Sequence, residues 1–165
     1  MKKDLEEQQT IGNKQNFLLF EEETFPDLMM EFLEKPNDVL PLLIIKVTSE
    51  CNSGGCVDYV KQANLVASIA KRQNRVGLLN CIGPEGHLCE LLPDHEIVDN
   101  TITIYLRNNK IYVYEGEHTK EGLLEYFSAD NWMESKVLED DLEKYLEILL
   151  ELDITWSEWV VKKLD

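Results

Sequence analysis

Four cysteines are the residues of this 165-residue chain whose type and spacing could do chemistry. They form two close pairs, Cys51 with Cys56 and Cys81 with Cys89. In a reducing compartment such residues are thiols or metal ligands, whereas in an oxidising one they can close two short loops. Zinc is disfavoured, because a four-cysteine site normally has two-residue spacings within each pair. We therefore expect no metal and no cofactor, and the spacing alone leaves the pairing open.

The first cysteine pair lies between a predicted central strand and a predicted helix. Residues 40–48 (LPLLIIKVT) are a nearly unbroken apolar run, which is typical of a strand covered on both faces. A helix is predicted from Cys56 to about Arg72, because small and apolar residues recur there on one face. A second strand is predicted at 75–80, and the resulting βαβ unit must be parallel and right-handed.

The other predicted elements surround this unit. A short strand at 17–20 precedes a helix at 24–34, which Pro36 ends. A helical turn is expected between Cys89 and Leu92. Strands at 101–106 and 110–115 form a hairpin through Asn108 and Asn109, and a helix capped by Thr119 covers 119–127. The pattern predicts an α/β domain with helices on both faces of one sheet.

We expect three segments: a disordered leader at 1–14, one folded domain at 15–128 and an acidic helical extension at 129–165. In the extension, apolar residues recur at helical spacing and two tryptophans follow. This stripe is expected to pack on the domain, and the alternative is a helix that docks on a partner. The stripe comprises Leu142, Tyr145, Leu146, Leu149, Leu150 and Leu152, together with Trp156 and Trp159.

The charge of the chain excludes some classes of function. A formal net charge of -16 argues against nucleic acid as a partner, because phosphate binding needs Lys and Arg. No run of eighteen apolar residues exists, so no membrane span is expected, and the first residues lack the apolar stretch of a secretory signal. The acidity indicates a well-solvated surface, or alternatively a weak calcium-buffering one.

Three stretches resemble the thioredoxin superfamily, and specifically its protein disulfide isomerase branch. They are LLIIKVTSE before Cys51, NCIGPEGHLCELL around the second cysteine pair, and ITIYLRNNKIYVYEGEHTKEGLLEYF at the hairpin and the following helix. The resemblance covers about residues 16–128. It implies a thioredoxin-like three-layer fold, in which a central mixed sheet is flanked by helices and the C-terminal helical extension is an addition.

The resemblance also implies roles for the cysteines. Cys51 would be the attacking thiol and Cys56 the resolving one, separated by four residues where the family has two; the alternative is that they are two thiols without a redox role. The glycines at 54 and 55 make a Cys51–Cys56 bridge sterically possible. An alternative alignment starts the motif at Ser53, so that serine replaces the first cysteine. Cys81 and Cys89 are expected to form a structural disulfide, as in the family, or else to be two buried free thiols.

A substrate groove beside the cysteines is implied at Asn100, Thr101 and His118. Thr101 stands where the family has a cis-proline, although it will strongly prefer a trans peptide. His118 stands where the family has an arginine that influences the resolving cysteine, and it could act so only when protonated. Ile45 stands where the family often has a buried acid, which leaves that proton acceptor absent.

Two functions follow as hypotheses. The first is a divergent disulfide oxidoreductase or isomerase that acts on client thiols during protein folding in the endoplasmic reticulum lumen. The second is a redox-inactive module, of chaperone type, that binds a protein partner or client through the groove. A calcium-buffering protein is a third, weaker reading. A monomer is expected, and a cytoplasmic location is the alternative to the lumen.

Overall fold

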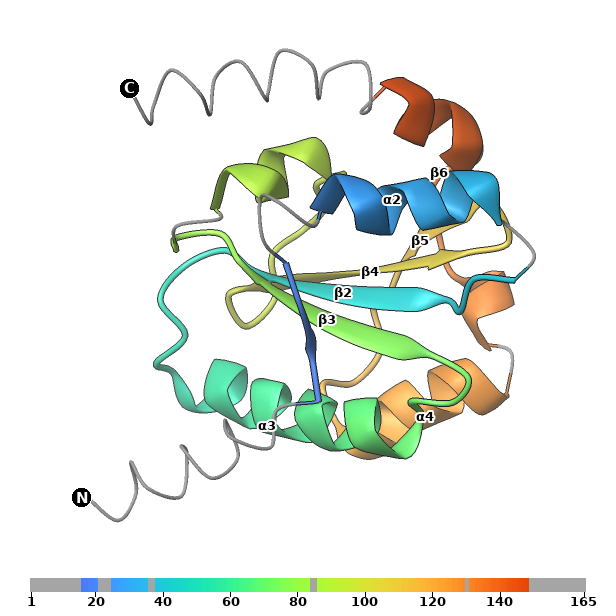
Figure 1. Cartoon of the computed structure of the whole chain (residues 1–165). Coiled ribbons are helices and arrows are strands. Elements are labelled where there is room, and N and C mark those ends of the chain that lie inside the picture. The colour runs from blue at the N-terminus through green and yellow to red at the C-terminus, as the bar shows by residue number, and fades with distance from the viewer. Residues whose placement is uncertain (1–15, 21–24, 36–37, 84–85, 130, 149–165) are drawn as a thin grey trace, which may run out of the picture.

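The structure is a computed structural model. It describes residues 16–20, 25–35, 38–83, 86–129 and 131–148 (Figure 1). The predicted leader at 1–14 and the apolar residues of the extension beyond 148, including both of its tryptophans, lie outside the described residues.

One mixed sheet forms the middle of the molecule. Its first three strands are parallel, and the others join by antiparallel pairing at the side of β2. β2 lies between β3 and β4, so the predicted apolar strand is central. In sheet order the strands are β1 (Leu18–Leu19), β3 (Arg75–Asn80), β2 (Leu42–Val47), β4 (Thr101–Arg107), β5 (Lys110–Val113) and β6 (Val137–Glu139).

Helices cover both faces of this sheet (Figure 1). One face is packed by α3 (Gly54–Ile69), α4 (Lys120–Ser128) and η2 (Asn131–Glu134). The other face carries α2 (Phe25–Glu34), η1 (Gly86–Leu91) and a helix that includes 142–148. The predicted thioredoxin-like α/β fold, with a mixed sheet between two helical layers, is confirmed.

The side chains of β2 build the two halves of the core. Leu43 and Ile45 face the α3 side, whereas Leu42 and Ile44 face the α2 side, and all four are fully buried. Successive side chains of a strand point to opposite faces, which explains why a doubly covered strand is apolar throughout. Ile45 is therefore an ordinary core residue.

Lys46 is the exception in β2, because its side chain is only 1% exposed. Its ammonium group donates to Pro93 O at 3.0 Å and Leu92 O at 3.4 Å, and it lies 3.1 Å from Asp94 Oδ1. These partners compensate the buried charge, which would otherwise be costly. Lys46 thereby fastens the segment after η1 against the sheet.

The segment beyond Ser128 contributes a strand as well as a helix. β6 pairs with β5, and three residues are too few for an alternating pattern that would have predicted it. In the following helix Leu142 and Leu146 are buried in the core on the α2 side, so the stripe packs on the domain there as expected. The hydroxyl of Tyr145 donates to Leu91 O in η1.

Candidate functional site

The strand register gathers the predicted site residues at one edge of the sheet. Val47, the last residue of β2, pairs with Asn80 at the end of β3 and with Thr101 at the start of β4. The segments that carry Cys51 and Cys81 therefore leave the sheet at the edge where the turn before Thr101 enters it. In Figure 1 the loop from β2 to α3 runs at the left of the sheet.

Cys51 and Cys56 are joined by a disulfide across a Cα–Cα distance of 5.4 Å. Gly54 and Gly55 are the first two residues of α3, and neither has a positive φ. The two cysteines differ in exposure: Cys56 is fully buried, whereas Cys51 is partly buried and packs against the core on the α3 side. An external thiol can therefore approach the bridge from the Cys51 side.

The helix α3 begins with Ser53 at its N-cap position. The Ser53 hydroxyl accepts a hydrogen bond from Cys56 N at 3.3 Å, and Cys56 is the third residue of the helix. Serine is among the preferred N-cap residues because it satisfies one of the helix's unpaired N–H groups. Cys51 lies two residues before this cap. Ser53 thus stands at the helix start, in the place that the alternative alignment gives it.

A two-residue turn lies beside the bridge. Asp99 and Asn100 both have left-handed backbone, with φ of 53° and 62°, and Val98 and Thr101 exchange two backbone hydrogen bonds of 2.9 Å. Asn100 O accepts from both Thr48 N and Thr48 Oγ1, at 2.9 and 3.1 Å. The Asn100 amide donates to Glu50 O at 3.1 Å, so the turn is tied to the residue before Cys51.

Thr101 contributes its backbone to this edge and keeps its side chain inside. The residue is 2% exposed, and its hydroxyl donates to Val98 O at 2.8 Å. No cis peptide bond occurs among the residues that the structure describes. The surface next to the bridge is therefore formed by the turn from Val98 to Asn100 and not by the Thr101 hydroxyl.

His118 reaches the same place from the segment before α4. Its Nδ1 lies 2.8 Å from Asp99 Oδ2, and its ring stacks on Tyr59 of α3 with centroids 3.8 Å apart and planes 8° apart. The Asp99 carboxylate in turn rests on Gly55, where a Cβ atom would lie 2.7 Å from Asp99 Oδ1. His118 is thus connected to the start of α3 through Asp99.

Tyr59 anchors this arrangement in the core. It is fully buried, and its hydroxyl lies 2.7 Å from Thr103 Oγ1 in β4. Burial raises the pKa of the Tyr59 phenol, and the hydrogen bond with Thr103 offsets only part of the rise. Tyr59 therefore stays neutral and holds the His118 ring by stacking alone.

Sequence reasoning missed Asp99 and Tyr59. The Asp99–Asn100 doublet just before a predicted strand was a usable signal, since these residues tolerate left-handed backbone in tight turns. Tyr59 carried no signal, because its contact with His118 joins residues 59 positions apart on different elements. Only the three-dimensional fold brings them together.

Cys81 and Cys89 form the second disulfide, with a Cα–Cα distance of 5.7 Å. They pack with the core on the α2 side, whereas Cys51 and Cys56 belong to the α3 side. Cys81 N donates to Val47 O at 2.8 Å, so this bridge begins directly at the end of the sheet. The sheet therefore separates the two disulfides.

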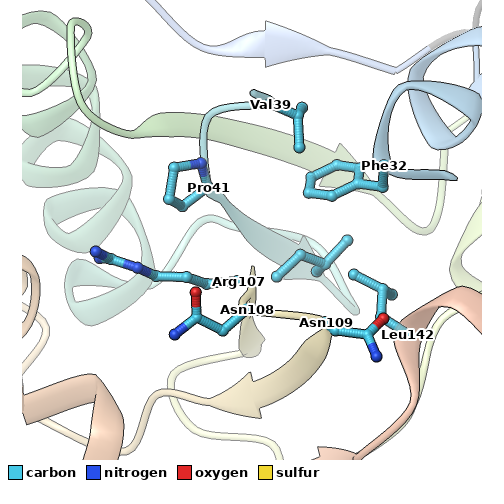
Figure 2. A pocket seen from close by; sticks show the side chains of 8 residues that line it. Phe32, Val39, Pro41, Arg107, Asn108, Asn109 and Leu142 are labelled. Carbon is cyan, nitrogen blue, oxygen red and sulfur yellow. The ribbon is translucent and has the colours of Figure 1, made fainter. Parts of the chain in front are cut away.

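A hollow of about 240 Å³ lies at the opposite edge of the sheet, beside the β4–β5 turn (Figure 2). Arg107 is the one ionisable residue in its lining, and its guanidinium stacks over Trp132 at 4.1 Å and donates to the Tyr105 hydroxyl at 3.0 Å. The guanidinium group of Arg107 is therefore engaged by Trp132 and Tyr105. Its lining is Phe32, Val39, Pro41, Leu106, Arg107, Asn108, Asn109 and Leu142.

No group of three or more His, Cys, Asp or Glu side chains is placed to hold a metal ion within the described residues. No helix in the described part of the chain is long and apolar enough to cross a membrane.

No protein-family model and no curated protein sequence matches the chain. Among solved structures, the chain is similar to the crystal structure of full-length ERdj5, with 20% sequence identity and a TM-score of 0.49. The similarity covers 70% of this chain and 15% of that chain. The assignment of a thioredoxin-like fold therefore rests on the strand order and the helical layers described above.

Proposed function

We propose that the chain is a divergent member of the disulfide isomerase branch that exchanges disulfides with protein clients during folding, with Cys51 as the attacked and attacking sulfur and Cys56 as the resolving one. The observation that carries the proposal is the Cys51–Cys56 bridge, which has one partly exposed and one fully buried end at the start of α3. Exchange needs an accessible sulfur for the mixed disulfide and a second sulfur that can return to it.

The same edge supplies a surface for the client. Cys51 is flanked by the turn from Val98 to Asn100, and Ile97 and Val98 are 56% and 49% exposed. Exposed apolar side chains beside a reactive bridge favour contact with unfolded chain segments. The proposed contact residues are the turn with Asn100, the start of β4 at Thr101, and His118.

The exchange proposal is tested by trapping the mixed disulfide. Cys56→Ala removes the resolving sulfur, so a peptide that contains a disulfide should accumulate as an adduct on Cys51. Cys51→Ala is the matched variant, because its remaining sulfur is buried and should form no adduct. Mass spectrometry of non-reduced protein measures both. If neither variant forms an adduct, or if both do equally, the proposed roles are wrong.

A second function, a redox-inactive module that binds clients, is favoured by Ser53. Its hydroxyl occupies the N-cap, the position where a helix end most strongly stabilises a thiolate. Under this function the Cys51–Cys56 bridge only shapes the surface. Binding of an unfolded peptide would then be unchanged in a Cys51→Ala, Cys56→Ala double variant, whereas exchange would be abolished.

The endoplasmic reticulum lumen is the proposed compartment, and the cytoplasm is the alternative. Two disulfides within one small domain support the oxidising compartment, because thiols stay reduced in the cytoplasm. Alkylation of the protein directly in cell lysates, followed by peptide mass mapping, would show four modified cysteines if the cytoplasmic alternative holds.

A further inference from the structure

Two loops beside the Cys51–Cys56 bridge are held together by reciprocal pairs of histidine and carboxylate. The loop before β4 contributes His95 and Asp99, and the segment after β5 contributes Glu115 and His118. His95 Nε2 lies 2.9 Å from Glu115 Oε2, and His118 Nδ1 lies 2.8 Å from Asp99 Oδ2. Each loop therefore contributes one histidine and one carboxylate, and the contact with His118 holds the Asp99 carboxylate.

One of these two carboxylates, that of Asp99, lies against α3. The Asp99 carboxylate lies so close to Gly55 that a Cβ atom there would be 2.7 Å from Oδ1 and 3.0 Å from Cγ. Gly55 is the second residue of α3 and directly precedes Cys56. The Glu115 side chain pairs with His95 and is 60% exposed, against 43% for the Asp99 side chain. Because Gly55 has no Cβ atom, the Asp99 carboxylate can lie against the first turn of α3.

A carboxylate on the first helical turn competes with a thiolate for the same electrostatic stabilisation. The positive end of a helix favours negative charge, and this normally promotes ionisation of a cysteine there. A fixed anion in that place uses the favourable potential and repels a second negative charge. Tight turn geometry keeps Asp99 in position, since its left-handed backbone is locked by the Val98–Thr101 hydrogen bonds.

We propose that Asp99, aimed at the start of α3 by His118, suppresses thiolate formation at the Cys51–Cys56 site and so slows its thiol chemistry. His118 acts as a positioning residue, because it touches Asp99 and Tyr59. The inference deepens the proposed function, yet it requires only that the bridge can be reduced and not that any client is turned over.

The test measures thiolate reactivity in the reduced, folded protein. Asp99→Asn keeps the side-chain shape and tolerates the left-handed backbone, while removing the charge. Loss of one nearby charge should give about tenfold more thiolate. A thiolate of lower pKa is also less nucleophilic, which offsets part of this gain. Alkylation of Cys51 by iodoacetamide at pH 7 should therefore be about threefold faster in Asp99→Asn than in the parent. Peptide mass mapping assigns the rate to Cys51 and separates it from the Cys81–Cys89 pair.

Glu115→Gln is the matched control, because it makes the same change of net charge and disrupts the other pair between the same loops. It should leave the alkylation rate within the error of the parent. An unchanged rate in Asp99→Asn, or an equal increase in both variants, overturns the inference.

A second variant separates position from charge. Gly55→Ala places a Cβ atom against Asp99 and forces the carboxylate away without changing the net charge. It should raise the rate in the parent and have no further effect when Asp99 is already Asn. A rise of equal size in both backgrounds would assign the effect to the helix itself and contradict the inference. If Cys56→Ala forms no mixed disulfide with a peptide, the proposed exchange function is refuted. The Cys51 alkylation rates do not depend on that result and still test the role of Asp99.

Discussion

At the scale of single residues, the site depends on a stack that begins in the core. Tyr59 is buried and bonded to Thr103, His118 lies flat on its ring, and Asp99 is held by His118. Each contact positions the next residue, so the position of the Asp99 carboxylate against α3 is determined by β4, the strand that carries Thr103. This explains how a surface turn can place a carboxylate against one particular glycine.

The Tyr59–Thr103 contact leads to a prediction about stability. Tyr59→Phe leaves the Thr103 hydroxyl without a partner in the core, and Thr103→Val does the same to Tyr59. Each should lower the free energy of unfolding by about 1–3 kcal/mol, because an unsatisfied buried polar group costs about that much. Urea denaturation at neutral pH measures the loss.

The double variant supplies the decisive comparison. Replacing both partners by apolar groups of similar shape leaves nothing unsatisfied, so its loss should be smaller than the sum of the single losses. Strictly additive losses would show that the two hydroxyls do not depend on one another.

At the scale of elements, the β4–β5 turn accepts hydrogen bonds from the first residues of the helix that includes 142–148. Asn109 O accepts from Leu142 N, and Asn109 Oδ1 accepts from Glu143 N, both at 2.8 Å. The first N–H groups of a helix have no partner within it; here the turn accepts from two of them, and Asp141 Oδ1 accepts from Lys144 N at 3.1 Å. Asn108 and Asn109 both have left-handed backbone, with φ of 52° and 62°.

This cap predicts a difference between two neighbouring substitutions. Glycine fits left-handed backbone at both positions and adds the same flexibility to the unfolded chain. Asn109→Gly also removes the acceptor for Glu143 N, so it should destabilise the protein by about 1 kcal/mol more than Asn108→Gly, which is the usual net contribution of one hydrogen bond. Thermal unfolding of the two variants gives the difference, and equal stability would exclude the capping role.

The Cys81–Cys89 bridge closes a short loop that includes the first part of η1. A cross-link stabilises chiefly by restricting the unfolded chain, and for a loop of this length the chain-entropy relation gives about 2–3 kcal/mol. A Cys81→Ala, Cys89→Ala double variant should lose that much stability. Its Cys51 adduct should still form, because the sheet separates the two bridges. Loss of the adduct in a folded double variant would contradict this separation.

At the scale of the whole molecule, the sequence predicted what depends on local pattern. Apolar runs gave the strands β2 and β3, and the asparagine pair gave the turn between β4 and β5. The sequence did not reveal β6, whose pairing partner lies more than twenty residues away and whose three residues carry no period. It did not reveal the contact between the Asp99 carboxylate and Gly55 either, because that contact depends on the register between β2 and β4.

The tyrosines make the alkaline stability of the whole molecule predictable. Burial raises the pKa of all six phenols above their ordinary value of about 10, and it raises that of Tyr145 to about 12. A raised folded-state pKa means that the folded chain holds the proton more tightly than the unfolded one. For Tyr145 this contribution to stability is complete below pH 10 and is lost as the pH rises through 12. Phenolate absorbance should therefore appear above pH 10 together with loss of the circular dichroism of the fold. A gradual titration centred near pH 10 in a protein that keeps its folded spectrum would show that these hydroxyls are open to water.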